Sequence, residues 1–184
     1  MKFQSVKSPL ILGAAGAMAL MLANAAPAAA QALNDPVVAA PNVEALFTSK
    51  DPKLNRNKQA AYHIETDLLE SHRWNEADKW LTQKYIQHNP QAASGLAGAV
   101  KFFTEVLKQT PLPLVRPTKV EVVAVIAEGD YVNVMTVRHL KDAKGNPYTS
   151  TWFDTWRFVD GKADEHWDAA ALPTGPAPSP AAAK

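Results

Sequence analysis

The chain has 184 residues, a length that suits one domain with terminal extensions. Its 19 basic and 18 acidic residues nearly cancel, which argues against a nucleic-acid-binding protein, because such proteins normally carry a basic excess or stripe. The absence of cysteine excludes disulfides, thiolate catalysis and thiolate-bound metal sites.

The first thirty residues have the features of a secretory signal. Residues 1–7 contain two lysines and no acid, an uncharged apolar run follows over Leu10–Leu22, and the small residues after it offer several Ala-x-Ala sites. The apolar run is too short for the ~20 residues that a transmembrane helix needs. We therefore expect residues 1–30 to be cleaved. Loss of Lys2 and Lys7 would leave 17 basic and 18 acidic residues in a periplasmic or secreted protein without a stable membrane anchor.

Two further segments have little capacity to build a core. Residues 31–54 contain three prolines and little periodicity, which predicts a linker or leader with a short helical turn near residues 43–47. Residues 173–184 are rich in Pro and Ala, which predicts a disordered tail. The folded domain is therefore expected over residues 55–172.

Three helices are predicted in the first half of this domain. Asn55 or Asn57 is expected to cap the first, which runs to about residue 71 with apolar residues at helical spacing. Asn75 is expected to cap the second as far as about residue 81, and Ser94 the third as far as about residue 108. The segment between the last two is predicted to be non-repetitive.

After residue 117 the hydrophobic period changes from that of a helix to that of a strand. Four antiparallel strands joined by tight turns are predicted at residues 118–127, 131–140, 148–159 and 162–170. Helices followed by an antiparallel meander predict an α+β domain. A twisted meander of this length can curl around the helices and leave a concave face.

The strand over residues 148–159 places a carboxylate among aromatic side chains. Because side chains alternate across a strand, one face carries mostly large residues and is expected to point inward. That face consists of Trp152, Asp154, Trp156 and Phe158. An ionised and unpaired Asp154 would cost several kcal/mol in such surroundings, so it needs a partner, a raised pKa or a hydrated cavity.

The final strand offers partners for Asp154. Three polar residues share one face of this strand: Asp164, His166 and Asp168. If the Asp160-Gly161 turn sets the pairing, His166 lies opposite Thr155 and is separated from Asp154 by the sheet. A one-residue shift or a bulge would bring His166 and Asp154 to the same side, and the sequence leaves both registers open.

His88 is a further polar candidate, in the non-repetitive segment that follows the second predicted helix. A neutral imidazole beside carboxylates is a common arrangement for acid/base catalysis, because its pKa lies near neutral pH.

Several motifs, taken together, resemble the SnoaL-like branch of the nuclear transport factor 2-like superfamily. They are Tyr85-Ile86-Gln87-His88-Asn89-Pro90, Gly95 ahead of Phe102-Phe103, Gly129-Asp130, the segment from Asp154 to Lys162, and Glu165-His166-Trp167-Asp168. The resemblance covers residues 55–172. It implies a cone-shaped α+β domain, in which a strongly curved antiparallel sheet wraps N-terminal helices and a pocket opens at one end.

The resemblance also implies a chemistry and its residues. The characterised polyketide cyclases of the family catalyse an intramolecular aldol condensation without metal or cofactor. Their acid/base is an acidic residue near the end of the last strand, which falls on Asp168 by alignment through Asp160-Gly161-Lys162. Asp154 stands where the cyclases hold a polar pocket residue, often His, and His88 matches the edge of the pocket in related proteins.

These observations predict proton transfer on a small, mostly apolar carbonyl compound during aldol-type cyclisation, isomerisation or hydrolysis. The expected catalytic residues are Asp168, His166, Asp154 and His88. The expected pocket wall comprises Trp152, Trp156, Phe158 and Tyr85. No cofactor is expected, and no metal site, because the sequence lacks HxH and HExxH spacing. The alternative is a non-catalytic module of the same fold that binds a small ligand or forms a homodimer through the outer face of the sheet.

Overall fold

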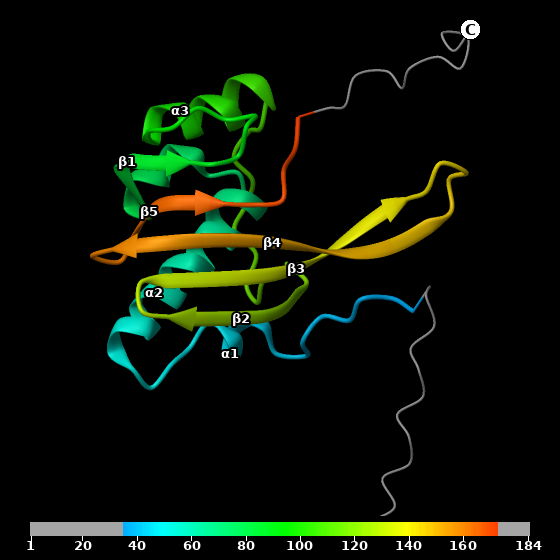
Figure 1. The fold of residues 1–184 in the computed structure, drawn as a ribbon, viewed down its shortest axis with the longest axis horizontal. Coiled ribbons are helices and arrows are strands. Elements are labelled where there is room, and N and C mark those ends of the chain that lie inside the picture. The colour runs from blue at the N-terminus through cyan, green and yellow to red at the C-terminus, as the bar shows by residue number, and fades with distance from the viewer. Residues whose placement is uncertain (1–34, 173–184) are drawn as a thin grey trace, which may run out of the picture. The chain divides into compact units, whose positions relative to one another are not determined.

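The computed structural model describes residues 35–172, so the expected signal (1–30) and tail (173–184) lie outside the described residues. Figure 1 shows the arrangement of its elements. In chain order they are α1 (Val43–Leu46), α2 (Pro52–His63), the π-helix η1 (Ile64–Glu70), the 3₁₀-helix η2 (Trp74–Lys79), β1 (Leu81–Gln87), α3 (Leu96–Lys101), the π-helix η3 (Phe102–Val106), β2 (Val122–Glu128), β3 (Tyr131–Lys141), β4 (Pro147–Val159) and β5 (Lys162–Trp167). Within the described part of the chain, no helix is both long enough and apolar enough to cross a membrane.

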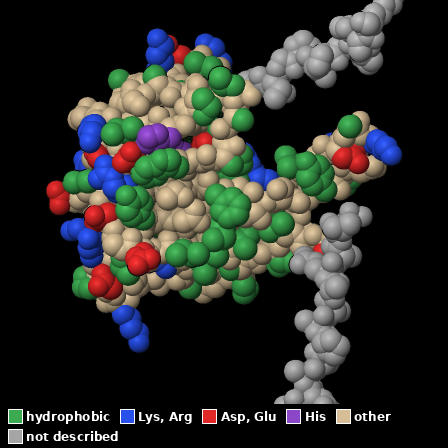
Figure 2. Space-filling view, viewed as in Figure 1, with side chains coloured by type: hydrophobic (Ala, Val, Ile, Leu, Met, Phe, Trp, Pro, Cys, Tyr) green, Lys and Arg blue, Asp and Glu red, His purple; other side chains and the backbone are tan. Residues whose placement is uncertain are grey.

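The five strands form one curved sheet in the order β1-β5-β4-β3-β2. The four C-terminal strands pair antiparallel, as predicted, whereas β1 pairs parallel with β5. In the view of Figure 1 the helices lie behind one face of the sheet, and Figure 2 shows hydrophobic and charged side chains together on the face in front. The α+β fold is confirmed, but β1 occupies residues where the end of a helix and a break were expected.

The helix caps differ from the predicted ones. Asp51 caps α2 by accepting a hydrogen bond from the Leu54 amide at 2.8 Å, and Pro52 then occupies the first turn, where a proline costs no hydrogen bond. Asn57 is instead buried inside the helix layer. Ser94 does not cap α3, because its hydroxyl accepts a hydrogen bond from the backbone of β1, and Gly95 precedes the helix. Likewise Arg73, and not Asn75, precedes η2.

Part of the segment expected to be a linker is packed. The short turn near residues 43–47 is confirmed as α1, and the Phe47 side chain behind it is only 1% exposed. Its ring meets Tyr62 of α2 edge-on, with 5.3 Å between ring centroids. Ala40 also donates a backbone hydrogen bond to Val122 at 2.8 Å. Residues before Asn55 therefore contribute to the core between the helices and the sheet.

A β-bulge in the last hairpin decides which side chains meet. Next to the turn, Phe158 pairs with Ala163, but one step further Arg157 pairs with Glu165, so that Asp164 is the extra residue. Beyond this point Trp156 pairs with His166, which brings His166 to the inner face together with Asp154. The second of the two predicted registers is therefore correct, and the pairing of His166 with Thr155 is wrong.

The bulge also moves Asp164 away from the face where it was expected. Its carboxylate bonds the Arg157 guanidinium at 2.6 Å, on the opposite side of the sheet from His166. A simple alternation predicted Asp164 beside His166, and the inserted residue breaks that alternation.

Candidate active site

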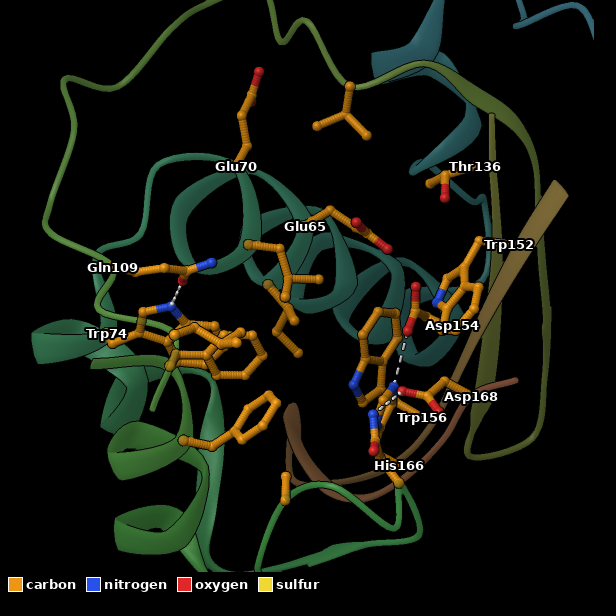
Figure 3. Close-up of a pocket in the computed structure, with 18 of the residues that line it drawn as sticks. Glu65, Glu70, Trp74, Gln109, Thr136, Trp152, Asp154, Trp156, His166 and Asp168 are labelled. Atoms are coloured by element: carbon orange, nitrogen blue, oxygen red, sulfur yellow. Dashed lines mark hydrogen bonds and ion pairs between the residues drawn. The ribbon is translucent and has the colours of Figure 1, made fainter. Parts of the chain in front are cut away.

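A cavity of about 570 Å³ lies between the inner face of the sheet and the helices (Figure 3). This volume is within the range of small-molecule sites. Three of the four predicted wall residues line it: Tyr85, Trp152 and Trp156. The prediction for Phe158 is wrong, because this side chain is 2% exposed and belongs to the packed core. It is the inward residue nearest the hairpin turn, where it pairs with the fully buried Ala163.

His166 lies at the centre of the polar end of the cavity, and hydrogen bonds fix both of its ring nitrogens. Nδ1 is 2.7 Å from Oε1 of Gln87, and Nε2 is 3.0 Å from Oδ1 of Asp154. The backbone N–H of Asn89 donates a hydrogen bond to the same Gln87 oxygen at 3.0 Å, so that oxygen is an acceptor. Nδ1 therefore carries a hydrogen, and the proton between Nε2 and Asp154 can belong to either group.

Two aromatic side chains hold the imidazole in place. The His166 ring stacks on Trp156, with centroids 5.2 Å apart, and on Tyr85 at 6.3 Å. The Trp156 indole donates to the Tyr85 hydroxyl at 3.3 Å. Burial, opposed by this hydrogen bond, raises the pKa of Tyr85, so its phenol stays neutral. The walls thus limit the motion of the imidazole and shield it from water.

Asp168 completes the polar end, and its carboxylate is oriented from two sides. Oδ2 accepts a hydrogen bond from the Asn89 side chain and Oδ1 accepts one from the Ala170 amide, both at 2.8 Å. The nearest ligand-type atoms of Asp154, His166 and Asp168 all lie within 4.8 Å of one another. Three of the four residues predicted to be catalytic are therefore brought together.

His88 is the exception, and the structure contradicts its predicted place in the pocket. Its Nε2 contacts Glu165 at 2.8 Å, its ring stacks on Trp167 at 4.9 Å, and its side chain is 43% exposed. The chain is extended here, so neighbouring side chains alternate. Gln87 and Asn89 point inward to His166 and Asp168, and His88 between them points outward. The motif did indicate the site, but through the neighbours of His88.

Glu65 is a site residue that sequence reasoning missed. It lies on η1, its side chain lines the cavity, and the residue is 4% exposed. Its Oε1 has no hydrogen-bond partner among the described residues. Burial, followed by repulsion from Asp154, raises the pKa of Glu65 well above the usual range. One signal was available, since Glu65 falls on the apolar stripe of its helix, one turn after Ala61.

The same three residues are the ones that could bind a metal ion within the described region: Asp154, His166 and Asp168. Their donor atoms are of the types that divalent cations accept. Each of the three groups is held by hydrogen bonds to other described residues or to one another.

Comparison with known proteins gives a family match and distant structural similarities. The sequence profile of the SnoaL-like domain matches residues 62–166. Among solved structures, TsrD from Streptomyces laurentii is 16% identical, with 61% of this chain and 86% of that chain covered and a TM-score of 0.44. A nuclear transport factor 2-like protein from Burkholderia pseudomallei is 14% identical, with 63% and 91% covered and a TM-score of 0.45.

A third solved structure, an LEH-like epoxide hydrolase from M. tuberculosis, is 12% identical, with 61% of this chain and 76% of that chain covered and a TM-score of 0.44. No curated protein matches the chain. Identities and TM-scores this low support no inference about a substrate. Any such inference has to come from the residues of the cavity.

Proposed function

Because the chain belongs to the SnoaL-like family, we propose that its cavity catalyses proton transfer on a small, mostly apolar carbonyl compound. The observation that supports this most strongly is the His166–Asp154 pair beside Asp168 at the end of a cavity of about 570 Å³. Each group can accept or release a proton, and aromatic side chains surround them.

In this proposal Asp168 is the base. It removes a proton from the carbon next to the substrate carbonyl, and the electron pair of the C–H bond forms a C=C bond while the carbonyl becomes an enolate. The hydrogen bonds from Asn89 and Ala170 keep the carboxylate aimed at one place, which reduces the entropic cost of reaching the reactive geometry. Exclusion of water by Trp156 and Trp152 strengthens electrostatic interactions with the developing charge.

The His166–Asp154 pair is proposed to transfer the second proton of the reaction, the one that is delivered to the substrate. Because Gln87 holds the hydrogen on Nδ1, only Nε2 exchanges a proton with Asp154. The pair can therefore deliver a proton to the substrate and recover it without a change in its own geometry. Return of a proton to a different carbon gives isomerisation, and attack of the enolate on a second carbonyl gives cyclisation.

The proposal is tested by the exchange of carbon-bound hydrogen. A neutral bicyclic ketone, 2-tetralone, is incubated with the protein in heavy water, and loss of its α-protons is followed by NMR. We expect wild-type protein to accelerate exchange and Asp168→Asn to slow it by about 100-fold or more, the usual size of a general-base contribution. Equal rates for the two proteins would show that Asp168 is not the base.

The binding-only alternative makes a different prediction in the same experiment. A non-catalytic module would bind 2-tetralone, detected by calorimetry, without exchange above the solution rate. A homodimer through the outer face of the sheet would bury exposed side chains such as Phe153 and Tyr131, and sedimentation velocity would detect it.

We also propose that the protein acts outside the cytoplasm. The support is the order of charged, apolar and small residues over residues 1–30. Expression of the full chain in a Gram-negative host, followed by fractionation and mass spectrometry, should recover a periplasmic protein that begins near residue 31. Recovery of the complete chain in the cytoplasm would contradict this.

A further inference from the structure

Glu65 is an acid in the cavity that the proposed reaction has not used. Its carboxyl group comes from the helix layer and points toward Asp154 and Trp152 on the sheet (Figure 3). Oε1 is sealed from solvent and has no hydrogen-bond partner among the described residues. The residue is 4% exposed, and it lies in a π-helix, a form that is frequent at functional sites.

The surroundings of Glu65 favour its neutral form. Burial penalises the carboxylate, and the nearby Asp154 adds repulsion, so the pKa of Glu65 is raised. The Arg138 guanidinium opposes this only weakly, because it is exposed and lies over the Trp152 ring, 4.2 Å from its centroid. A protonated carboxyl group is a hydrogen-bond donor, and a buried donor without an acceptor is costly. The described residues supply no acceptor for it, and because Oε1 is sealed, only a proton on Oε2 can meet an acceptor provided by an occupant of the cavity.

The other charges in the cavity wall restrict what that occupant can be. Besides Glu65, four carboxyl groups line the cavity against two basic side chains. The acids are Glu70, Glu121, Asp154 and Asp168, and the bases are Lys119 and Arg138. An anionic ligand would be repelled by this wall, whereas a neutral ligand with an accepting oxygen would satisfy the buried donor.

We propose that Glu65 is a second catalytic residue, which donates a hydrogen bond and then its proton to the carbonyl oxygen of the substrate. The cavity would thus select neutral ketones or aldehydes over carboxylates of the same shape. This inference rests on the proposed function, because it supplies the acid that complements the base Asp168.

The step balances without any other reactant. Asp168 takes the proton from the α-carbon, the C–H electron pair forms the C=C bond, and the carbonyl π-electrons move to oxygen. That oxygen takes the proton of Glu65, so the substrate becomes a neutral enol, Asp168 is protonated and Glu65 is ionised. Collapse of the enol reverses both transfers and restores the two acids.

The first experiment measures exchange of 2-tetralone in four proteins: wild type, Glu65→Gln, Glu65→Leu and Glu105→Gln. Gln keeps a hydrogen-bond donor but cannot transfer a proton, so we expect about 10- to 100-fold slower exchange at saturation with little change in binding. Leu removes the donor as well and should weaken binding too. Glu105 is the matched control, since it lies on the π-helix η3 with a 65% exposed side chain that faces Lys101. Glu105→Gln should exchange at the wild-type rate.

The second experiment reads Glu65 directly. In protein labelled with ¹³C at the glutamate carboxyl carbons, the Glu65 resonance is assigned by its absence from Glu65→Gln. We expect it at the position of a protonated acid at pH 7, and we expect 2-tetralone to move it. 2-Naphthoate, a flat anion of similar size, should not.

The outcomes separate this inference from the proposed function. Wild-type exchange in Glu65→Gln, or a Glu65 resonance that is ionised at pH 7 or unaffected by 2-tetralone, would overturn the assignment of Glu65. A loss in Tyr85→Phe with no loss in Glu65→Gln would transfer the role to the Tyr85 hydroxyl. If Asp168→Asn exchanges normally but Glu65 still responds to the ketone, the base is wrong and the oxygen-binding acid stands. Thermal unfolding should show Glu65→Leu to be folded and at least as stable as wild type, because it removes a buried polar group without a partner.

Discussion

The β4–β5 hairpin carries carboxylates on both faces, and the partners of these carboxylates differ between the two faces. On the outer face Asp164 and Glu165 both hold the Arg157 guanidinium, at 2.6 and 2.9 Å, and His88 contacts Glu165. On the inner face Asp154 and Asp168 meet a histidine, amides and aromatic rings. No lysine or arginine forms an ion pair with these two inner acids in the part of the chain that the structure describes.

This difference appears in the proton affinities of the acids. Burial acts to raise the pKa of Asp164, but hydrogen bonds from Thr82 and Arg157 outweigh it, and the pKa lies below its usual value. The hydrogen bonds of Glu165 to His88 and Arg157 lower its pKa as well. In the cavity, burial and the neighbouring Asp154 raise the pKa of Glu65. The outer acids are therefore fixed charges, whereas the cavity favours the neutral form of Glu65.

The largest expected effect comes from removing the imidazole of the inner face. His166→Gln should slow exchange of 2-tetralone by about 100- to 1,000-fold, because Asp154 loses the group with which it shares a proton. His88→Gln is the matched control, the same substitution on the outer face, and its rate should stay within about twofold of wild type. NMR in heavy water measures both rates. Similar losses in the two variants would show that the faces do not differ in function.

The next effect concerns the outer face and affects stability rather than catalysis. Arg157→Met leaves the nearly buried Asp164 without its cation, which should cost about 1–3 kcal/mol of unfolding free energy. Urea denaturation measures this loss, and the exchange rate per folded molecule should not change. Arg157→Lys should recover part of the stability. A fall in the exchange rate of folded Arg157→Met would contradict the separation of the two faces.

The smallest effect is a difference in pH dependence. The pKa of Glu65 is raised, so its contribution to stability is complete below pH 4.5 and is lost as the pH rises through its folded-state pKa. The pKa of Asp164 is lowered, so its contribution is complete above pH 3.8 and is lost as the pH falls through its folded-state pKa.

Urea denaturation of wild type, Glu65→Gln and Asp164→Asn across the pH range checks these signs. Relative to wild type, Glu65→Gln should gain stability as the pH rises, and Asp164→Asn should gain stability as the pH falls. The opposite slope for either variant would show that the corresponding pKa shift has the wrong sign.

The sequence predicted what depends on alternation within one strand. Trp152, Asp154 and Trp156 share the inner face of β4 because a regular strand has a strict period of two. The Asp160-Gly161 turn located the hairpin for a similarly local reason, because this residue pair is typical of tight hairpin turns. The inward direction of Asp154 and the presence of an α+β fold followed from these patterns.

Features that depend on distant parts of the chain were not predictable in this way. The parallel pairing of β1 with β5 joins segments about 80 residues apart, and together with the alternation of an extended chain it explains why Gln87 and Asn89 point into the site while His88 does not. Phe158 obeys the alternation but meets the packed end of the domain. Glu65 was overlooked because its role depends on the sheet opposite it and not on its own helix.

The extra residue in β5 has a consequence for how such a chemistry can be gained or lost. Because Asp164 is the residue left out of the pairing, its deletion would give a regular hairpin that still holds His166 opposite Trp156 on the inner face. Loss of the bulge with Asp164 retained would instead place His166 opposite Thr155 and turn the imidazole out to the solvent, although every side chain needed for proton transfer would still be encoded. The presence of the bulge, read together with the spacing from the turn, is thus as informative as the histidine itself. Relatives that keep the Glu-His-Trp-Asp segment but lack one residue ahead of it would be expected to hold the histidine on the inner face with a regular hairpin in place of the bulge.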